Sequence, residues 1–222
     1  WFRDRGYEER QSGERLDTLG FRTTSSVGIY ALEFEGALQT GRSFNPDTGQ
    51  LDKINAAGGH VDLTGQFKLL GYDQAVFMSI AAGTGDSTDA NKEFRNPNND
   101  SSLMGDMHVV GDMSGVDVND HHASGLQIYT VGWGIELTRK LNLSVTGRKF
   151  VAASVEDGFS RRIGLETDIN MTYSPNRDYT LIVGYDHFFT DTFYRQASGS
   201  RRDVDYAFAM LAFNYDWTRR KR

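Results

Sequence analysis

The stretch RRIGLETDINMTYSPNRDYTLIVGYDHFF, residues 161–189, holds two alternating runs of residues separated by the polar break SPNRD. Alternation at every second residue predicts two extended strands joined by a turn, each with one apolar and one polar face. The apolar row comprises Ile163, Leu165, Ile169, Met171, Tyr173, Leu181, Val183 and Tyr185. The opposite row comprises Arg162, Glu166, Asp168, Asn170, Thr172 and Asp186.

The same period of two recurs in nine segments, and helical periodicity is nowhere sustained. The predicted strands are residues 16–27, 29–41, 54–70, 72–83, 125–138, 141–151, 162–173, 179–189 and 204–217. They exceed the roughly five or six residues of a typical strand. A tilted strand needs about 9 to 11 residues to cross a bilayer, so these segments are long enough.

The connections between the segments alternate in length. Short breaks contain SSVG, LLGYD, TRKLN and SPNRD, whereas the intervening connections are longer, the longest running from Thr84 to Ser124. In an up-and-down meander, alternate connections lie at the same end of the sheet. One end with tight turns and one with long loops is the asymmetry of transmembrane β-barrels.

Composition excludes several classes of protein. The chain has 222 residues, 30 acidic and 24 basic side chains in mixed order, a net charge of -6 and no cysteine. It has no basic stripe of the kind that nucleic-acid binding requires, and no apolar run of about 18 residues that would form a spanning helix. Enough apolar material is present for a folded domain.

These features favour an all-β, antiparallel up-and-down transmembrane β-barrel. In hydrocarbon every backbone N–H and C=O must bond within the protein, which leaves helices and closed barrels as spanning structures. Aromatic residues near the segment ends, such as Tyr30, Tyr72 and Tyr179, suit the girdles of such a barrel. A soluble antiparallel barrel or sandwich with the apolar row inside gives the same alternation and is the alternative.

Several motifs resemble the alginate export family of outer-membrane porins. They are TLGFR (18–22), LEFEGALQTGR (32–42), GTGD (83–86), residues 164–189, and DYAFAMLAFNYDW (205–217). The resemblance implies a Gram-negative outer-membrane barrel of about eighteen strands, of which this chain would be the C-terminal half, and passage of an anionic polysaccharide. Nine strands cannot close an antiparallel barrel, so we expect a missing N-terminal part or a further chain. We treat residues 1–222 as one domain, with residues 84–123 as a long outer loop.

Alternation predicts which side chains line the lumen. They are Arg22, Glu33, Glu35, Gln39, His60, Asp62, Lys68, Glu136, Arg148, Arg162, Glu166, Asp168 and Asp186, with seven acids against four bases. A channel for a polyanion should instead offer rings of Arg or Lys. Arg22, Arg148 and Arg162 could equally pair with acids on neighbouring strands and hold the wall together.

The loops contain the remaining candidates. Residues 116–122 (VDVNDHH) and 45–52 (NPDTGQLD) are rich in oxygen ligands, notably Asp117, Asn119, Asp120, Asp47 and Asp52, yet neither matches a calcium-loop spacing. His121 and His122 with Asp120 are the candidates for an outer-membrane hydrolase, and a structural envelope barrel is a further alternative. Asp186 and His187 are adjacent in a strand, so they should point to opposite faces. We predict a passive channel for hydrophilic solutes in the outer membrane, without enzyme activity, cofactor or metal.

Overall fold

The computed structural model describes residues 2–4, 15–45, 49–86, 92–94, 107, 109 and 113–213. The protein is all-β with a single short helix in this part of the chain. The strands are β1 (Phe2–Asp4), β2 (Arg15–Val27), β3 (Tyr30–Asn45), β4 (Gln50–Leu69), β5 (Tyr72–Gly83), β6 (Gly115–Val118), β7 (His121–Thr138), β8 (Leu141–Val155), β9 (Arg162–Tyr173), β10 (Tyr179–Thr190) and β11 (Val204–Phe213), and the helix is α1 (Thr192–Ser198).

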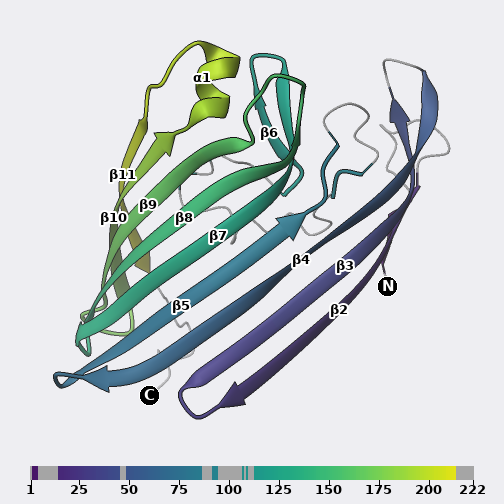
Figure 1. Ribbon diagram of the computed structural model, residues 1–222. Coiled ribbons are helices and arrows are strands. Elements are labelled where there is room, and N and C mark those ends of the chain that lie inside the picture. The colour runs from purple at the N-terminus through teal and green to yellow at the C-terminus, as the bar shows by residue number, and fades with distance from the viewer. Residues whose placement is uncertain are drawn as a thin grey trace.

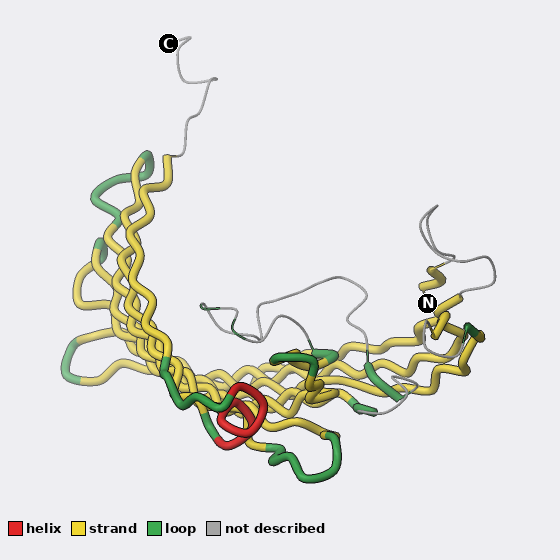
Figure 2. Tube along the Cα trace, turned by 90° about the horizontal axis from the view of Figure 1, so that it is seen from above, coloured by secondary structure: helices red, strands yellow, loops and turns green. Residues whose placement is uncertain are grey.

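One antiparallel sheet contains all the strands, in the order β1-β2-β3-β4-β5-β7-β8-β9-β10-β11, with β6 paired to β7 outside this path. The predicted up-and-down antiparallel topology is therefore confirmed. Figure 2 shows that the sheet curls into a deep arc. Among the described residues β1 and β11 are its two edges, and no pairing joins them, so the sheet is open.

All nine predicted segments are strands, but β6 and α1 escaped the sequence analysis. β6 with the start of β7 forms a hairpin inside residues 84–123, which were predicted as loop. The two residues between β6 and β7, Asn119 and Asp120, have φ values of 47° and 64°. This left-handed pair is the geometry of a tight two-residue hairpin turn, which Asn and Asp tolerate. Tyr215 and Trp217 of the predicted last strand lie outside the described residues.

Short turns gather at one end of the sheet, and the longer connections lie at the other end with α1 and the β6–β7 hairpin (Figure 1). The turn between β4 and β5 consists of Leu70 and Gly71, with φ values of 54° and 87°. Such a turn matches the twist of the strands it joins. The predicted alternation of tight turns and long connections is thus present, and we call the two ends the turn end and the loop end.

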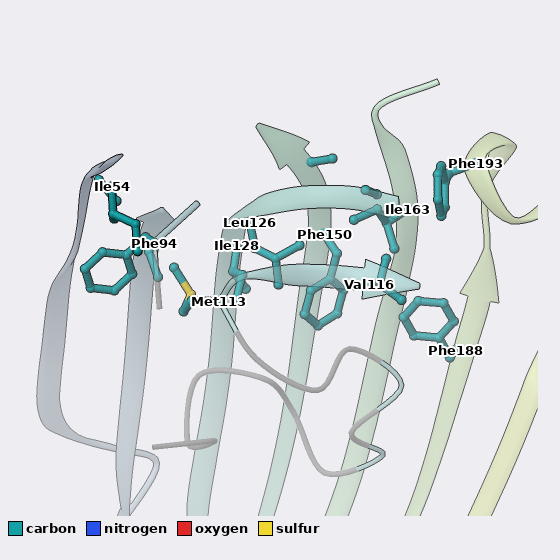
Figure 3. Packing of buried hydrophobic residues seen from close by; sticks show 14 residues of the cluster. Ile54, Phe94, Met113, Val116, Leu126, Ile128, Phe150, Ile163, Phe188 and Phe193 are labelled. Carbon is teal, nitrogen blue, oxygen red and sulfur yellow. The ribbon is translucent and has the colours of Figure 1, made fainter. Parts of the chain in front are cut away.

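The hydrophobic core lies at the loop end (Figure 3). Ile54 of β4, Leu126 of β7 and Phe150 of β8 are almost fully buried there. Phe94 and Met113 come from the connection between β5 and β6, and both belong to the same cluster. α1 adds Phe193, which is 1% exposed. The cluster is where the long connections fold back onto the sheet.

The two faces of the sheet differ as the alternation predicts. Large apolar side chains project from one face, which we call the apolar face, and they remain exposed: Leu19, Leu38, Met78, Ile80, Val131, Leu165, Ile169, Val183 and Tyr185 among them. Ile80 is 55% exposed and Val131 59% exposed. Ile163, predicted in the same row, is instead fully buried. The pairing of β8 with β9 shifts between Phe150 and Val151, so the simple alternation ends just before Ile163 is reached.

Candidate functional site: the polar face of the sheet

The opposite face, which we call the polar face, carries most of the side chains predicted to line a lumen. On this face Phe94 packs over Gly58 of β4, and Met113 lies next to Gly83 of β5. The strand register brings the predicted residues together in facing pairs. Arg22 faces Glu35, Glu35 faces His60 and Glu33 faces Asp62. Farther along the sheet, Arg148 faces Glu166 and Asp168 faces Asp186.

The first group of charges, the β2–β4 cluster, comprises Arg22, Glu33, Glu35, His60 and Asp62. The Arg22 guanidinium lies 2.7 Å from a Glu33 carboxylate oxygen and 3.8 Å from Glu35. His60 Nδ1 lies 2.9 Å from Asp62 and its Nε2 lies 3.8 Å from Glu35. Three carboxylates therefore share one guanidinium and an imidazole. The cluster is accessible, since the Glu35 side chain is 46% exposed.

Within the part of the chain that the structure describes, Glu33, Glu35 and His60 are close enough together to hold a metal ion. One ligand atom from each lies within 4.8 Å of the other two. Arg22 already contacts both glutamates, so a metal ion there would have to displace the guanidinium. The geometry fits an ion-pair network that joins β2, β3 and β4 at least as well as a metal site.

The second group, the β8–β10 cluster, comprises Arg148, Glu166, Asp168 and Asp186. The three acids are at most 1% exposed. Arg148 donates a hydrogen bond to Asp168, and its guanidinium lies 3.7 Å from Glu166. A buried charge costs several kcal/mol, as an order of magnitude, unless it is paired and hydrogen-bonded. Among the described residues, Arg148 is the cation that contacts Asp168 and Glu166.

A hollow of about 220 Å³ connects the two clusters across the middle of the polar face. Asp62 of the β2–β4 cluster and Arg148 of the β8–β10 cluster both line it, together with Ser79 and Thr130. Charged groups therefore lie on both sides of this hollow.

The other predicted lining residues lie apart from the two clusters. Buried Gln39 approaches Thr18 at 3.4 Å near the loop end. Lys68 and Glu136 line a hollow of about 620 Å³ at the turn end, where Lys68 also approaches Asp73 at 3.7 Å. Arg162 contacts Thr192 at 2.6 Å and Asp191 at 3.6 Å. It therefore anchors the start of α1 and belongs to neither cluster.

The histidines considered for a hydrolase lie in the β6–β7 hairpin. This hairpin extends past the end of β5, which pairs with residues 127–136 of β7. His122 contacts Asp117 at 2.6 Å and Glu93 at 3.5 Å. The hydrogen bond to Glu93 is the main reason that its pKa is raised to about 9, so His122 is protonated at neutral pH. A protonated imidazole is no general base, which weakens the hydrolase hypothesis.

In the oxygen-rich segment at residues 116–122, the side chains contact other groups of the protein. His121 Nδ1 lies 3.0 Å from Glu156 and its ring lies on Phe159. This contact with His121 is the main cause that lowers the pKa of Glu156. Because Asp117 is paired with His122 and Asp120 forms the hairpin turn, neither is arranged around a shared cation. Asp47 lies outside the described residues.

Asp186 and His187 point to opposite faces, as predicted. Asp186 is buried on the polar face, whereas His187 lies 2.8 Å from Asp205 of β11 on the apolar face. Tyr185 donates a hydrogen bond of 2.5 Å to the same carboxylate. The sequence analysis missed this group, because the partners lie on strands whose register only the structure gives.

The comparisons with known proteins add no identification. No protein-family model matches the chain, and no curated protein aligns with it significantly. The described residues contain no helix with the length and hydrophobicity needed to cross a membrane.

Proposed function

We propose that this chain forms part of the wall of an outer-membrane β-barrel that conducts hydrophilic solutes. One observation carries the proposal: the same strands bury acidic side chains on one face and expose hydrocarbon on the other. Glu166 of β9 is fully buried, whereas Ile169 of the same strand is 47% exposed. A soluble sheet protein buries its apolar face and leaves charge in water. Exposed apolar surface on this scale requires a cover, and lipid supplies one for every strand alike.

The edges of the sheet support the same proposal. In hydrocarbon an unpaired strand edge leaves N–H and C=O groups without partners, at a cost of several kcal/mol each as an order of magnitude. β1 and β11 must therefore be paired in the membrane. Further strands, from an upstream part of the protein or from another chain, would close the barrel, in line with the barrel of about eighteen strands that the resemblance to the alginate export family implies.

The passage of an anionic exopolysaccharide rests on that resemblance alone. The accessible β2–β4 cluster places three carboxylates around one arginine, and such a surface repels a polyanion. Hydrophilic solutes in general are therefore the cargo that the described residues support. A channel needs no enzyme chemistry, cofactor or metal, and the proposal includes none.

Conductance measurements test the proposal directly. The full-length protein, purified in detergent and added to a planar lipid bilayer, should produce discrete current steps in potassium chloride. A correctly folded barrel that inserts into the bilayer without any current would contradict the channel and favour a structural envelope role.

Membrane contact can be tested separately on the two faces of β9. Ile169→Arg puts a cation on the apolar face and should destabilise the protein in lipid vesicles by about 2–4 kcal/mol. Thr172→Arg, on the polar face of the same strand, is the matched control and should cost far less. Equal losses for the two variants would argue against lipid contact on the apolar face.

A further inference from the structure

Three basic side chains form one row across β2, β3 and β4 at the loop end of the sheet, where β2 and β4 begin and β3 ends (Figure 1). The strand register places Arg15 opposite Arg42, and Arg42 opposite Lys53. All three side chains are exposed. We call Arg15, Arg42 and Lys53 the basic row. Like charges that face one another directly destabilise a sheet, so a row of three needs an explanation.

The basic row lies on the apolar face of the sheet. Leu19, Leu38 and Ala57 also face one another in register, and each is an even number of residues from the basic side chain of its own strand. Residues an even number of positions apart on a strand share a face. The pairing of β2 with β3 is continuous from Arg15 to Val27, so the alternation is uninterrupted there. The cations therefore share a face with the exposed leucines.

The protein neutralises the basic row only in part. Asp17 contacts Arg15. Within the described part of the chain, Arg42 and Lys53 form no ion pair. Long basic side chains near the end of a membrane-spanning segment extend toward the headgroups and keep their charge there. Arg42 and Lys53 can therefore bind an anion that comes from outside the protein.

A hollow of about 610 Å³ lies beside the basic row on the same strands. Leu19, Leu38 and Ala57 line it, and because they face one another on the apolar face, the hollow opens on that face. Thr40 and Asn55 line it as well, and they face each other between these apolar residues and the basic row. The hollow thus changes from hydrocarbon to polar groups and then to cations toward the loop end.

We propose that the basic row and this hollow bind an anionic lipid that carries a phosphate group. The planar guanidinium of Arg42 can donate two parallel hydrogen bonds to a phosphate, and Lys53 adds a compact positive charge. An acyl chain suits the leucines of the hollow, because both then leave water. This inference rests on the proposed function, since a membrane brings lipid to the apolar face, and it adds a lipid partner in the leaflet at the loop end.

Native mass spectrometry of the full-length protein in a neutral detergent tests this site. Dioleoyl phosphatidic acid should bind about ten times more tightly than dioleoyl phosphatidylcholine, which has the same chains but no net charge. The double variant Arg42→Gln, Lys53→Gln should bind phosphatidic acid about tenfold more weakly, a loss of one decade of affinity. An equal concentration of inorganic phosphate should displace little of the lipid, because it has no chain to occupy the hollow.

The double variant Arg139→Gln, Lys140→Gln is the matched control, because it removes the same charge from the exposed turn between β7 and β8. It should leave lipid binding unchanged. Equal affinity of the wild-type protein for the two lipids, or equal losses in the two double variants, would overturn the site. Displacement of the lipid by inorganic phosphate would overturn it too, in favour of a phosphate-ion site. Protein that prefers phosphatidic acid but carries no current would refute the channel and retain the lipid site.

Discussion

At the scale of single residues, Arg148 is the basic side chain that contacts two of the three buried acids of the β8–β10 cluster. Its guanidinium contacts Asp168 and lies 3.7 Å from Glu166, and both acids are at most 1% exposed. Removing one partner of a buried pair costs more than the pair itself contributes, because the remaining charge stays in a medium that solvates it poorly.

Arg148→Met should therefore lower the free energy of unfolding by about 3–5 kcal/mol. Urea titration of the protein in lipid vesicles measures this change. Arg177→Met, in the exposed turn between β9 and β10, is the control and should be nearly neutral. A loss below about 1 kcal/mol for Arg148→Met, the range of surface ion pairs, would show that the cation is dispensable.

The contacts of His122 and Glu156 make the stability of the β6–β7 hairpin depend on pH. The pKa of His122 is raised from 6.5 to about 9. The contribution of its protonated imidazole to the stability of the hairpin is therefore fully present below pH 6.5 and is lost as the pH rises through about 9. The pKa of Glu156 is lowered, so its contribution is present above about pH 4.5, its usual value, and is lost as the pH falls through the lower pKa of the folded state.

Amide hydrogen exchange in residues 115–124, corrected for intrinsic rates, should thus show weaker protection at pH 10 than at pH 7. His122→Gln should remove most of that difference. If wild type and variant respond to alkali equally, the contacts with Glu93 and Asp117 do not hold the hairpin.

At the scale of elements, α1 fastens the connection before β11 to the loop end of the sheet. Asp191 caps the helix by accepting a hydrogen bond from the Thr192 backbone, and Arg162 of β9 contacts both residues. Phe193 enters the hydrophobic cluster, and the neighbouring Tyr194 ring lies 5.9 Å from that of Phe188. Burial raises the pKa of Tyr194 to about 12.

Phe193→Ala should release α1, since deletion of a buried phenyl ring costs about 3–5 kcal/mol. Limited proteolysis should then cut within residues 192–198 at least ten times faster, roughly the factor that 1.4 kcal/mol produces. Arg195→Ala, on the exposed side of the same helix, should leave the rate unchanged. If Phe193→Ala is cleaved at the same rate as the wild-type protein, other residues must hold α1 on the sheet.

At the scale of the whole molecule, the polar face should set ion selectivity. Glu33 and Glu35 are accessible acids on the polar face, and a wall of one sign favours ions of the opposite sign. The double variant Glu33→Gln, Glu35→Gln should shift the reversal potential in a tenfold potassium chloride gradient toward anions.

Lys149→Gln also changes one charge, but Lys149 faces Leu165 on the apolar side of the sheet. It should leave the reversal potential unaltered. A Glu33 and Glu35 variant that behaves like wild type would mean that these acids do not face the conducting path.

Most of the fold could be predicted from the sequence. Strands β2 to β5 and β7 to β11 follow from alternation, because successive side chains of a strand point to opposite faces whatever surrounds it. The β6–β7 hairpin was missed although Asn119 and Asp120 between two alternating stretches are a turn signal. α1 was missed because it is too short to show a helical period.

The candidate site could be predicted only as a row of residues. Alternation put Glu33, His60 and Arg148 on one face, but it could not show that Arg148 serves Asp168 or that Arg162 serves α1. Partners on different strands depend on register, and the shift between Phe150 and Val151 alters which face a residue meets. The buried position of Ile163 has the same origin.

The sequence by itself determined the strands, their two chemically distinct faces and the division into a turn end and a loop end. Each of these follows from spacing along the chain, which is a local property of the backbone. Only the tertiary structure decided which charges share a cation, which connections cover the polar face and which basic side chains face one another on the apolar face. These depend on contacts between residues far apart in the chain, and such contacts exist only once the strands are paired in register.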